Sequence, residues 1–152
     1  MDDAITAPTR SAVAHVILAL YGVLLAAIAF WPTPVDAGLG GLIAQLTSTL
    51  PALTYPRLEF GANILLFFPL GVLLALILPR ARYLVVPLSL VVTVTVECVQ
   101  AIALDQWTPS VMDIVANTTG ACLGLLLVAL IAAARRPAPA RTTTAELAEI
   151  ED

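Results

Sequence analysis

The chain has 152 residues, of which 60% are hydrophobic and 12% are charged, and its mean hydropathy is +0.97. Soluble domains carry about 25% charged residues, so this composition excludes an ordinary water-soluble protein and indicates a membrane protein. The formal net charge is -4 and the chain contains no lysine, which excludes a nucleic-acid-binding protein with a basic surface.

Four long apolar runs follow one another along the chain, at residues 12–30, 60–78, 83–104 and 111–134. Each run has about the 20 residues that an α-helix needs to cross ~30 Å of hydrocarbon. Lipid offers the backbone no hydrogen-bond partners, so all four runs should be helical. The predicted fold is therefore all-α: a polytopic membrane protein with four transmembrane helices in a small bundle, forming one domain over residues 12–134.

The arginines predict how the bundle is oriented. Six of the seven precede the first run, separate the second from the third, or follow the fourth, and only Arg57 falls on the other side. The six are Arg10, Arg80, Arg82, Arg135, Arg136 and Arg141. By the positive-inside rule both termini and the 79–82 turn should be cytoplasmic. Residues 1–11 then form a cytoplasmic N-terminal segment, and residues 135–152, rich in Pro and Ala and then acidic, form a disordered cytoplasmic tail.

The stretch between the first and second runs has its own pattern. Residues 38–50 read GLGGLIAQLTSTL, which is apolar but too short to cross the membrane. Two interpretations stay open: an amphipathic helix lying at the outer interface, and a loop.

Acidic and amide side chains gather near the outer ends of three of the runs. Each of these runs carries one acid and one amide, three or four residues apart, so both lie on one face of the helix. The pairs are Glu59 and Asn63, Glu97 and Gln100, and Asp113 and Asn117. On the third run Ser89 and Thr93 extend the face of Glu97 and Gln100 into one continuous polar stripe. Ionisable groups inside a span cost several kcal/mol unless they face partners or water. Their similar depth on three helices predicts one shared ligand-binding site, open to the outer face, with Arg57 at its rim.

These side chains also have structural interpretations. Ser110 fits the N-cap of the fourth helix, with Asp113 placed to reach back to it. Asn63 and Asn117 could hydrogen-bond across helices and hold them together. Glu97 lies too deep to cap a helix, so the choice for it is between a functional role and a paired structural role.

No metal or cofactor site is predicted. Glu59, Glu97 and Asp113 together could hold a divalent cation, since hard cations prefer oxygen ligands. The sequence nevertheless lacks metal-binding Cys and His spacings, Gly-rich phosphate loops and nucleophile elbows. Cys98 and Cys122 lie in apolar runs, and the preferred interpretation is two unpaired, buried side chains rather than a disulfide.

Motifs in three of the runs resemble those of VanZ-like membrane proteins. The second run, EFGANILLFFPLGVLLALILPR, is similar to the family's N-x-L-L-F-x-P-x-G pattern. The third ends in ECVQ, similar to E-x-x-Q, and the fourth opens with DIVANTTGACLG, similar to D-x-x-x-N-x-x-G-x-x-x-G. The resemblance covers residues 58–128. The signature positions that it assigns are Asn63, Pro69, Gly71, Glu97, Gln100, Asp113, Asn117 and Gly120.

One departure from the family pattern precedes the fourth run. Family members commonly carry an arginine a few residues before the Asp, whereas residues 105–110 here read DQWTPS and contain no basic residue. Arg57 is the one arginine on the same predicted side of the membrane.

The resemblance implies a multi-pass protein of the bacterial inner membrane that acts on the cell envelope. A named family member is associated with resistance to the glycopeptide teicoplanin. We expect the outward-facing site to bind a lipid headgroup or a lipid-linked envelope precursor, with membrane lipid as the surroundings. Two alternatives stay open: a structural or partner subunit of a homo- or hetero-oligomeric complex, and an acid/base enzyme acting on a lipid-linked substrate. The enzyme is the less favoured, because no nucleophile lies beside a base.

Overall fold

The computed structural model describes residues 3–31, 38, 40–50, 53–103 and 110–135, with side chains described from residue 12 onward and without that of residue 46. Every regular element in this part of the chain is a helix. The elements are α1 (Asp3–Ala29), α2 (Gly40–Thr49), α3 (Tyr55–Ile77), the 3₁₀ turn η2 (Arg82–Leu84), α4 (Val85–Ala103) and α5 (Val111–Ala134). The predicted all-α fold is thereby confirmed.

Four of these helices are long and apolar enough to cross a membrane: Ala12–Ala29, Tyr55–Ile77, Arg82–Ala103 and Val111–Ala134. They agree in number and order with the four predicted spans. The second begins at Tyr55 rather than at residue 60, because Pro56 stands in the first turn, where its missing N–H costs nothing. The first helix likewise begins earlier than predicted, at Asp3. The predicted tail beyond residue 135 lies outside the described residues.

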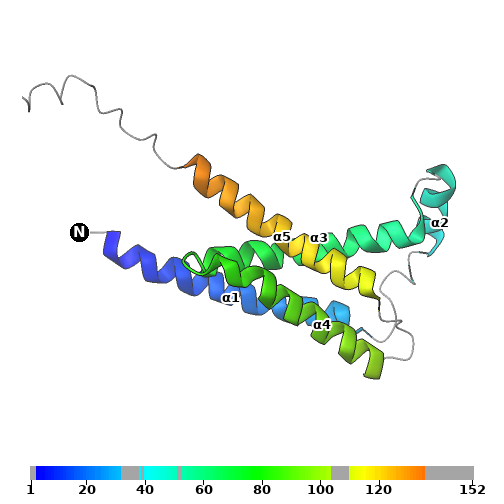
Figure 1. Ribbon diagram of the computed structural model, residues 1–152, viewed down its shortest axis with the longest axis horizontal. Helices are drawn as coiled ribbons and strands as arrows, with labels where there is room; N and C mark the ends of the chain where they lie inside the picture. Colours follow the sequence, from blue (N-terminus) through cyan, green and yellow to red (C-terminus); the bar gives the residue numbers. More distant parts are fainter. Residues whose placement is uncertain (1–2, 32–37, 39, 51–52, 104–109, 136–152) are drawn as a thin grey trace, which may run out of the picture.

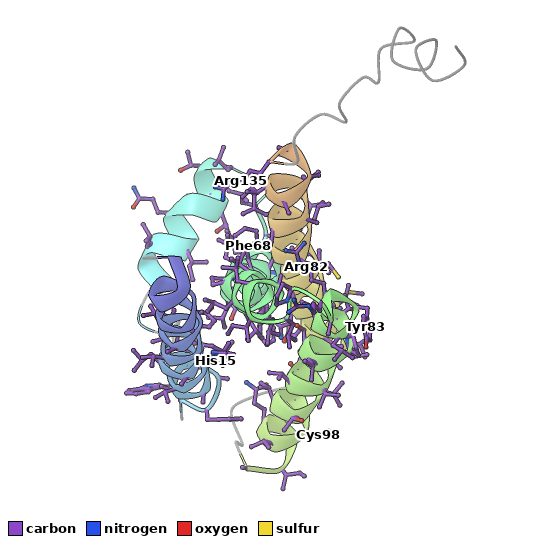
Figure 2. The ribbon with its side chains drawn as sticks, turned by 90° about the vertical axis from the view of Figure 1, so that its left-hand side faces the viewer. His15, Phe68, Arg82, Tyr83, Cys98 and Arg135 are labelled. Atoms are coloured by element: carbon purple, nitrogen blue, oxygen red, sulfur yellow. The ribbon has the colours of Figure 1, made fainter. Side chains whose placement is uncertain are left out.

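The long helices run alternately up and down (Figure 1). The start of α1, the turn between α3 and α4, and the end of α5 lie at one end of the bundle, and α2 lies at the other. Residues 40–49 form the helix α2. A helix here was one of the two interpretations of this stretch, and the other, a loop, is wrong. Viewed from the end that carries Arg82 and Tyr83, α3 lies between α1 on one side and α4 and α5 on the other (Figure 2).

The closest packing in the bundle joins α3 to α5. A Cβ atom added at Gly71 would lie 2.7 Å from Cα of Ala121, and one added at Gly124 would lie 2.7 Å from the backbone N of Val72. A Cβ at Gly120 would collide with the backbone of Ile64. These glycines let two helices meet backbone to backbone, as small residues do in membrane helix pairs.

Large apolar side chains are exposed on the surface of the bundle, whereas several hydrogen-bonding side chains are buried in its interior. Exposed side chains include Ile102, Val111, Leu65 and Val23, each at least 70% exposed. Ser89, Thr93, Glu97, Gln100 and Asn117 are instead buried. A chain that turns hydrocarbon outward and hydrogen-bonding groups inward is suited to lipid as its solvent.

The helix α1 is attached more loosely than the others. It packs on α3, where Leu25 joins Phe67 and Leu70 in a buried cluster and the hydroxyl of Tyr21 donates to the carbonyl oxygen of Leu66. Most of its side chains from residue 12 onward remain exposed.

Candidate functional site

The predicted polar stripe of α4 faces the inside of the bundle. Ser89 and Thr93 have no exposed surface, and Glu97 and Gln100 are 7% and 6% exposed. The spacing of these four residues keeps them on one side of the helix, so a single seam along α4 carries a serine, a threonine, a carboxylate and an amide. The stripe ends one turn from the C-terminal end of α4, at Ala103.

Two asparagines join the three core helices across this seam. The Asn63 side chain on α3 donates from Nδ2 to Oδ1 of Asp113 on α5, at 2.9 Å. One turn deeper, Asn117 on α5 donates from Nδ2 to Oγ1 of Thr93 on α4, at 2.8 Å. Both amides thus make the cross-helix hydrogen bonds that the structural interpretation anticipated, and each uses an amide N–H that would otherwise lie unsatisfied in hydrocarbon.

Glu97 is linked to the start of α5. Its Oε2 accepts from the backbone N–H of Ser110 at 2.9 Å. Ser110 is the N-cap of α5, and its hydroxyl accepts from the N–H of Met112. The anticipated reach-back of Asp113 to this cap is wrong, because the described hydrogen bond of the Asp113 carboxylate is the one from Asn63. Asp113 is held by α3 rather than by its own helix end.

The remaining predicted site residues lie apart from this centre. The Gln100 side chain donates from Nε2 to the carbonyl oxygen of Ala29 at 2.8 Å, so it binds α4 to α1 instead of facing Asp113. Arg57 and Glu59 are exposed on the first turns of α3. Both make contacts of their own, and the Glu59 and Asp113 carboxylates act electrostatically on Glu97.

We define the acceptor cluster as Glu97, Asp113, Asn63, Asn117 and Thr93. It stands where α3, α4 and α5 meet, toward the end of the bundle opposite the α3–α4 turn. Oδ1 of Asn117 is buried and has no hydrogen-bond partner among the described residues. Together with two carboxylates, it makes the cluster rich in acceptors, which suits a ligand that donates hydrogen bonds.

The sequence reasoning missed two contributions to this region. The backbone N–H of Ser110 is the partner of Glu97, and no side-chain pattern encodes a backbone donor. The link from Tyr21 to α3 was also missed, because a tyrosine in an apolar run gives no signal of which helix it meets. Gly71 and Gly120 were noted as signature positions, and the structure places both in the α3–α5 contact.

The described residues give no support to a metal centre. Within residues 12–31, 40–50, 53–103 and 110–135, no group of three His, Cys, Asp or Glu side chains is placed to hold a metal ion. Cys98 and Cys122 are both free; Cys122 is partly buried, whereas Cys98 is exposed on α4 and was wrongly expected to be buried (Figure 2).

Comparison with known proteins places the chain in a family. A family model described as VanZ/LLP1 matches residues 18–132, a range that includes α2, α3 and α4, the C-terminal part of α1 and most of α5. Searches of curated proteins and of solved structures returned no significant match.

Proposed function

The chain belongs to the VanZ/LLP1 family, and from that premise we propose that it acts in the bacterial cell envelope by binding the polar headgroup of a lipid or lipid-linked precursor. The binding groups are Glu97 and Asp113, supported by Asn63 and Asn117. The observation that carries the proposal is the burial of a carboxylate, Glu97, at a junction of helices within a candidate membrane span. Such a carboxylate is costly to keep in a membrane unless it has a task or a partner.

Orientation supports the same proposal. Arg80, Arg82 and Arg135 stand at the end of the bundle that carries the α3–α4 turn and the end of α5. By the positive-inside rule that end faces the cytoplasm of the bacterial inner membrane, and both termini lie there. The acceptor cluster then lies toward the outer face, where envelope precursors and glycopeptide antibiotics are found.

The test of this function uses teicoplanin susceptibility. Wild type and Glu97→Gln are expressed in a teicoplanin-susceptible bacterium, and protection is scored together with the amount of protein in the membrane. Glu146→Gln, which removes the same charge in the predicted tail, is the matched control. We expect protection from wild type and Glu146→Gln, and its loss in Glu97→Gln at equal protein level.

Two other outcomes would each contradict a part of the proposal. If wild type gives no protection, the resistance role is wrong for this member of the family. If Glu97→Gln protects as well as wild type, the Glu97 carboxylate takes no part in binding.

A structural role is the second candidate, and the hydrogen bonds themselves favour it. Asn63 with Asp113 and Asn117 with Thr93 fix the register of three helices. On this alternative the protein serves as a partner subunit in a homo- or hetero-oligomer, and Glu97→Gln should lower the amount of protein in the membrane instead of its activity.

A further inference from the structure

A groove runs between α4 and α5 on the outside of the bundle. It has a volume of about 380 Å³, is open along one side, and is lined by Leu90, Ile114, Val115, Thr118, Thr119 and Cys122. This volume falls within the roughly 300–1,000 Å³ typical of small-molecule sites. We call it the α4–α5 groove.

The outer end of the groove lies close to the acceptor cluster along α5. Its row on α5, Ile114, Thr118 and Cys122, has the four-residue spacing of one helix face, and the same row continues outward to Ser110. Ser110 is the residue whose N–H binds Glu97. From Cys122 to Ile114 the row is ~12 Å long at the helical rise. The outer end of the groove, at Ile114, therefore lies one helical turn from the residue that holds the Glu97 carboxylate, and the other end lies deeper in the span.

The lining of the groove is apolar where it faces outward. The hydroxyl of Thr119 is occupied by the carbonyl oxygen of Val115 at 2.7 Å, and Thr118 Oγ1 is buried beneath the surface. The groove consequently offers methyl and methylene groups to its occupant. A hydrocarbon chain fits such a surface, whereas a polar solute would leave its own groups unsatisfied.

The acceptor cluster near the outer end of the groove has the opposite character. Glu97 and Asp113 are acceptors, and Oδ1 of Asn117, a residue only 4% exposed, has no partner among the described residues. Asn117 reaches across the α4–α5 seam one turn below Glu97, since its other amide atom binds Thr93. Because the cluster holds the carboxylates of Glu97 and Asp113, it favours a cationic hydrogen-bond donor, and a primary ammonium group carries three N–H donors.

We propose that the α4–α5 groove holds one acyl chain of a phospholipid whose primary amine headgroup binds at Glu97. The inference deepens the proposed function, because it names the class of headgroup and adds the site for its hydrocarbon. The short distance along α5 between the groove and Ser110, one helical turn, distinguishes this lipid from those that merely surround the bundle.

The experiment maps contacts of a photoreactive lipid. The full chain is reconstituted in phosphatidylcholine bilayers that contain a small fraction of phosphatidylethanolamine with a diazirine in the middle of one acyl chain. Adducts are located by mass spectrometry. We expect adducts on residues 114–122 at about fivefold or more the density on the exposed face of α1, a ratio that corresponds to ~1 kcal/mol of preference.

Two variants locate the acyl chain. Val115→Trp places a large side chain at the mouth of the groove, on a residue that is already exposed, and should reduce adducts on residues 114–122 to the level on α1. Leu126→Trp is the matched control, since this exposed residue lies three turns deeper on the same face of α5 and outside the groove lining. Equal adduct density on α1 and on the groove in wild type would overturn the proposal.

A control lipid and a cross-link separate the remaining outcomes. The same diazirine chain on phosphatidylcholine, which has no N–H donor, should lose most of the excess, and so should phosphatidylethanolamine with Glu97→Gln. An undiminished excess in both would overturn the amine headgroup, and with it the headgroup site of the proposed function, while the acyl-chain site stands. Oxidation of a Cys98→Ser variant to a Cys122-linked dimer would show a second copy in the groove and overturn the acyl-chain site.

Discussion

Replacing Gly71 with alanine tests whether α3 and α5 pack backbone to backbone. The added methyl carbon would lie 2.7 Å from Cα of Ala121 and 2.8 Å from its carbonyl carbon. Carbon atoms in contact prefer separations of ~3.5–4.0 Å, so the helices must move apart by about 1 Å. Backbone atoms cannot rotate out of the way as a side chain can. The overpacking should therefore cost ~2–3 kcal/mol, the upper part of the usual range.

Gly61→Ala on the same helix supplies the control. A Cβ at Gly61 meets nothing within 4 Å. Both variants gain the same ~0.5–1 kcal/mol from replacing a helical glycine, so the difference between them isolates the overpacking. We expect Gly71→Ala to be less stable than Gly61→Ala by ~2–3 kcal/mol.

Reversible unfolding in mixed micelles, followed by helicity and by loss of tertiary contact, gives the free energies of unfolding. A difference between the two variants below about 0.5 kcal/mol, the size of an ordinary surface substitution, would refute the close approach of α3 and α5. A Gly71→Ala variant that does not accumulate at all, beside a normal Gly61→Ala, agrees with the expected direction.

Of three further predictions, the first two use the same measurement of unfolding and the third uses protease cleavage. A double-mutant cycle on Asn63→Leu and Asp113→Leu should give a coupling of ~0.6–1.7 kcal/mol, as cross-helix hydrogen bonds in membranes do, and additive effects would deny that bond. Ser110→Ala should cost ~0.5–2 kcal/mol through loss of the N-cap and leave phosphatidylethanolamine cross-linking to the groove unchanged, because the backbone donor to the carboxylate remains. Gln100→Leu removes the donor to Ala29 and should make α1 more accessible to protease without lowering the stability of the other three helices, and an unchanged cleavage rate would contradict that link.

Much of the fold follows from the sequence because lipid offers the backbone no hydrogen-bond partners, so apolar runs of sufficient length must be helical. Length, hydropathy and the positions of arginines predict four helices, and the structure has four helices of the required length. The boundaries differ where local chemistry outweighs hydropathy. α3 begins at Tyr55 with Pro56 in its first turn, in a stretch that is more polar than the predicted run from residue 60.

The candidate site was predictable in its composition and not in its pairings. Helical spacing placed Ser89, Thr93, Glu97 and Gln100 on one face, and all four are buried. Spacing along one helix says nothing about which neighbour each residue meets, however. Gln100 meets a carbonyl oxygen of α1, although the acid and amide pairs suggested that it joins the acids. Such pairings depend on how each helix is rotated about its axis and on backbone donors. A pattern of residue types along the sequence predicts neither of these.

The loose attachment of α1 has a consequence for the order in which the protein assembles. During synthesis α1 leaves the ribosome first, yet its partners, the carbonyl of Leu66 and the amide of Gln100, belong to α3 and α4 and are made later. Because α1 is apolar on nearly every side, it can remain inserted in lipid as an independent segment until the other helices are made. We therefore expect α3, α4 and α5 to form their shared polar seam first, and α1, although made before them, to join last.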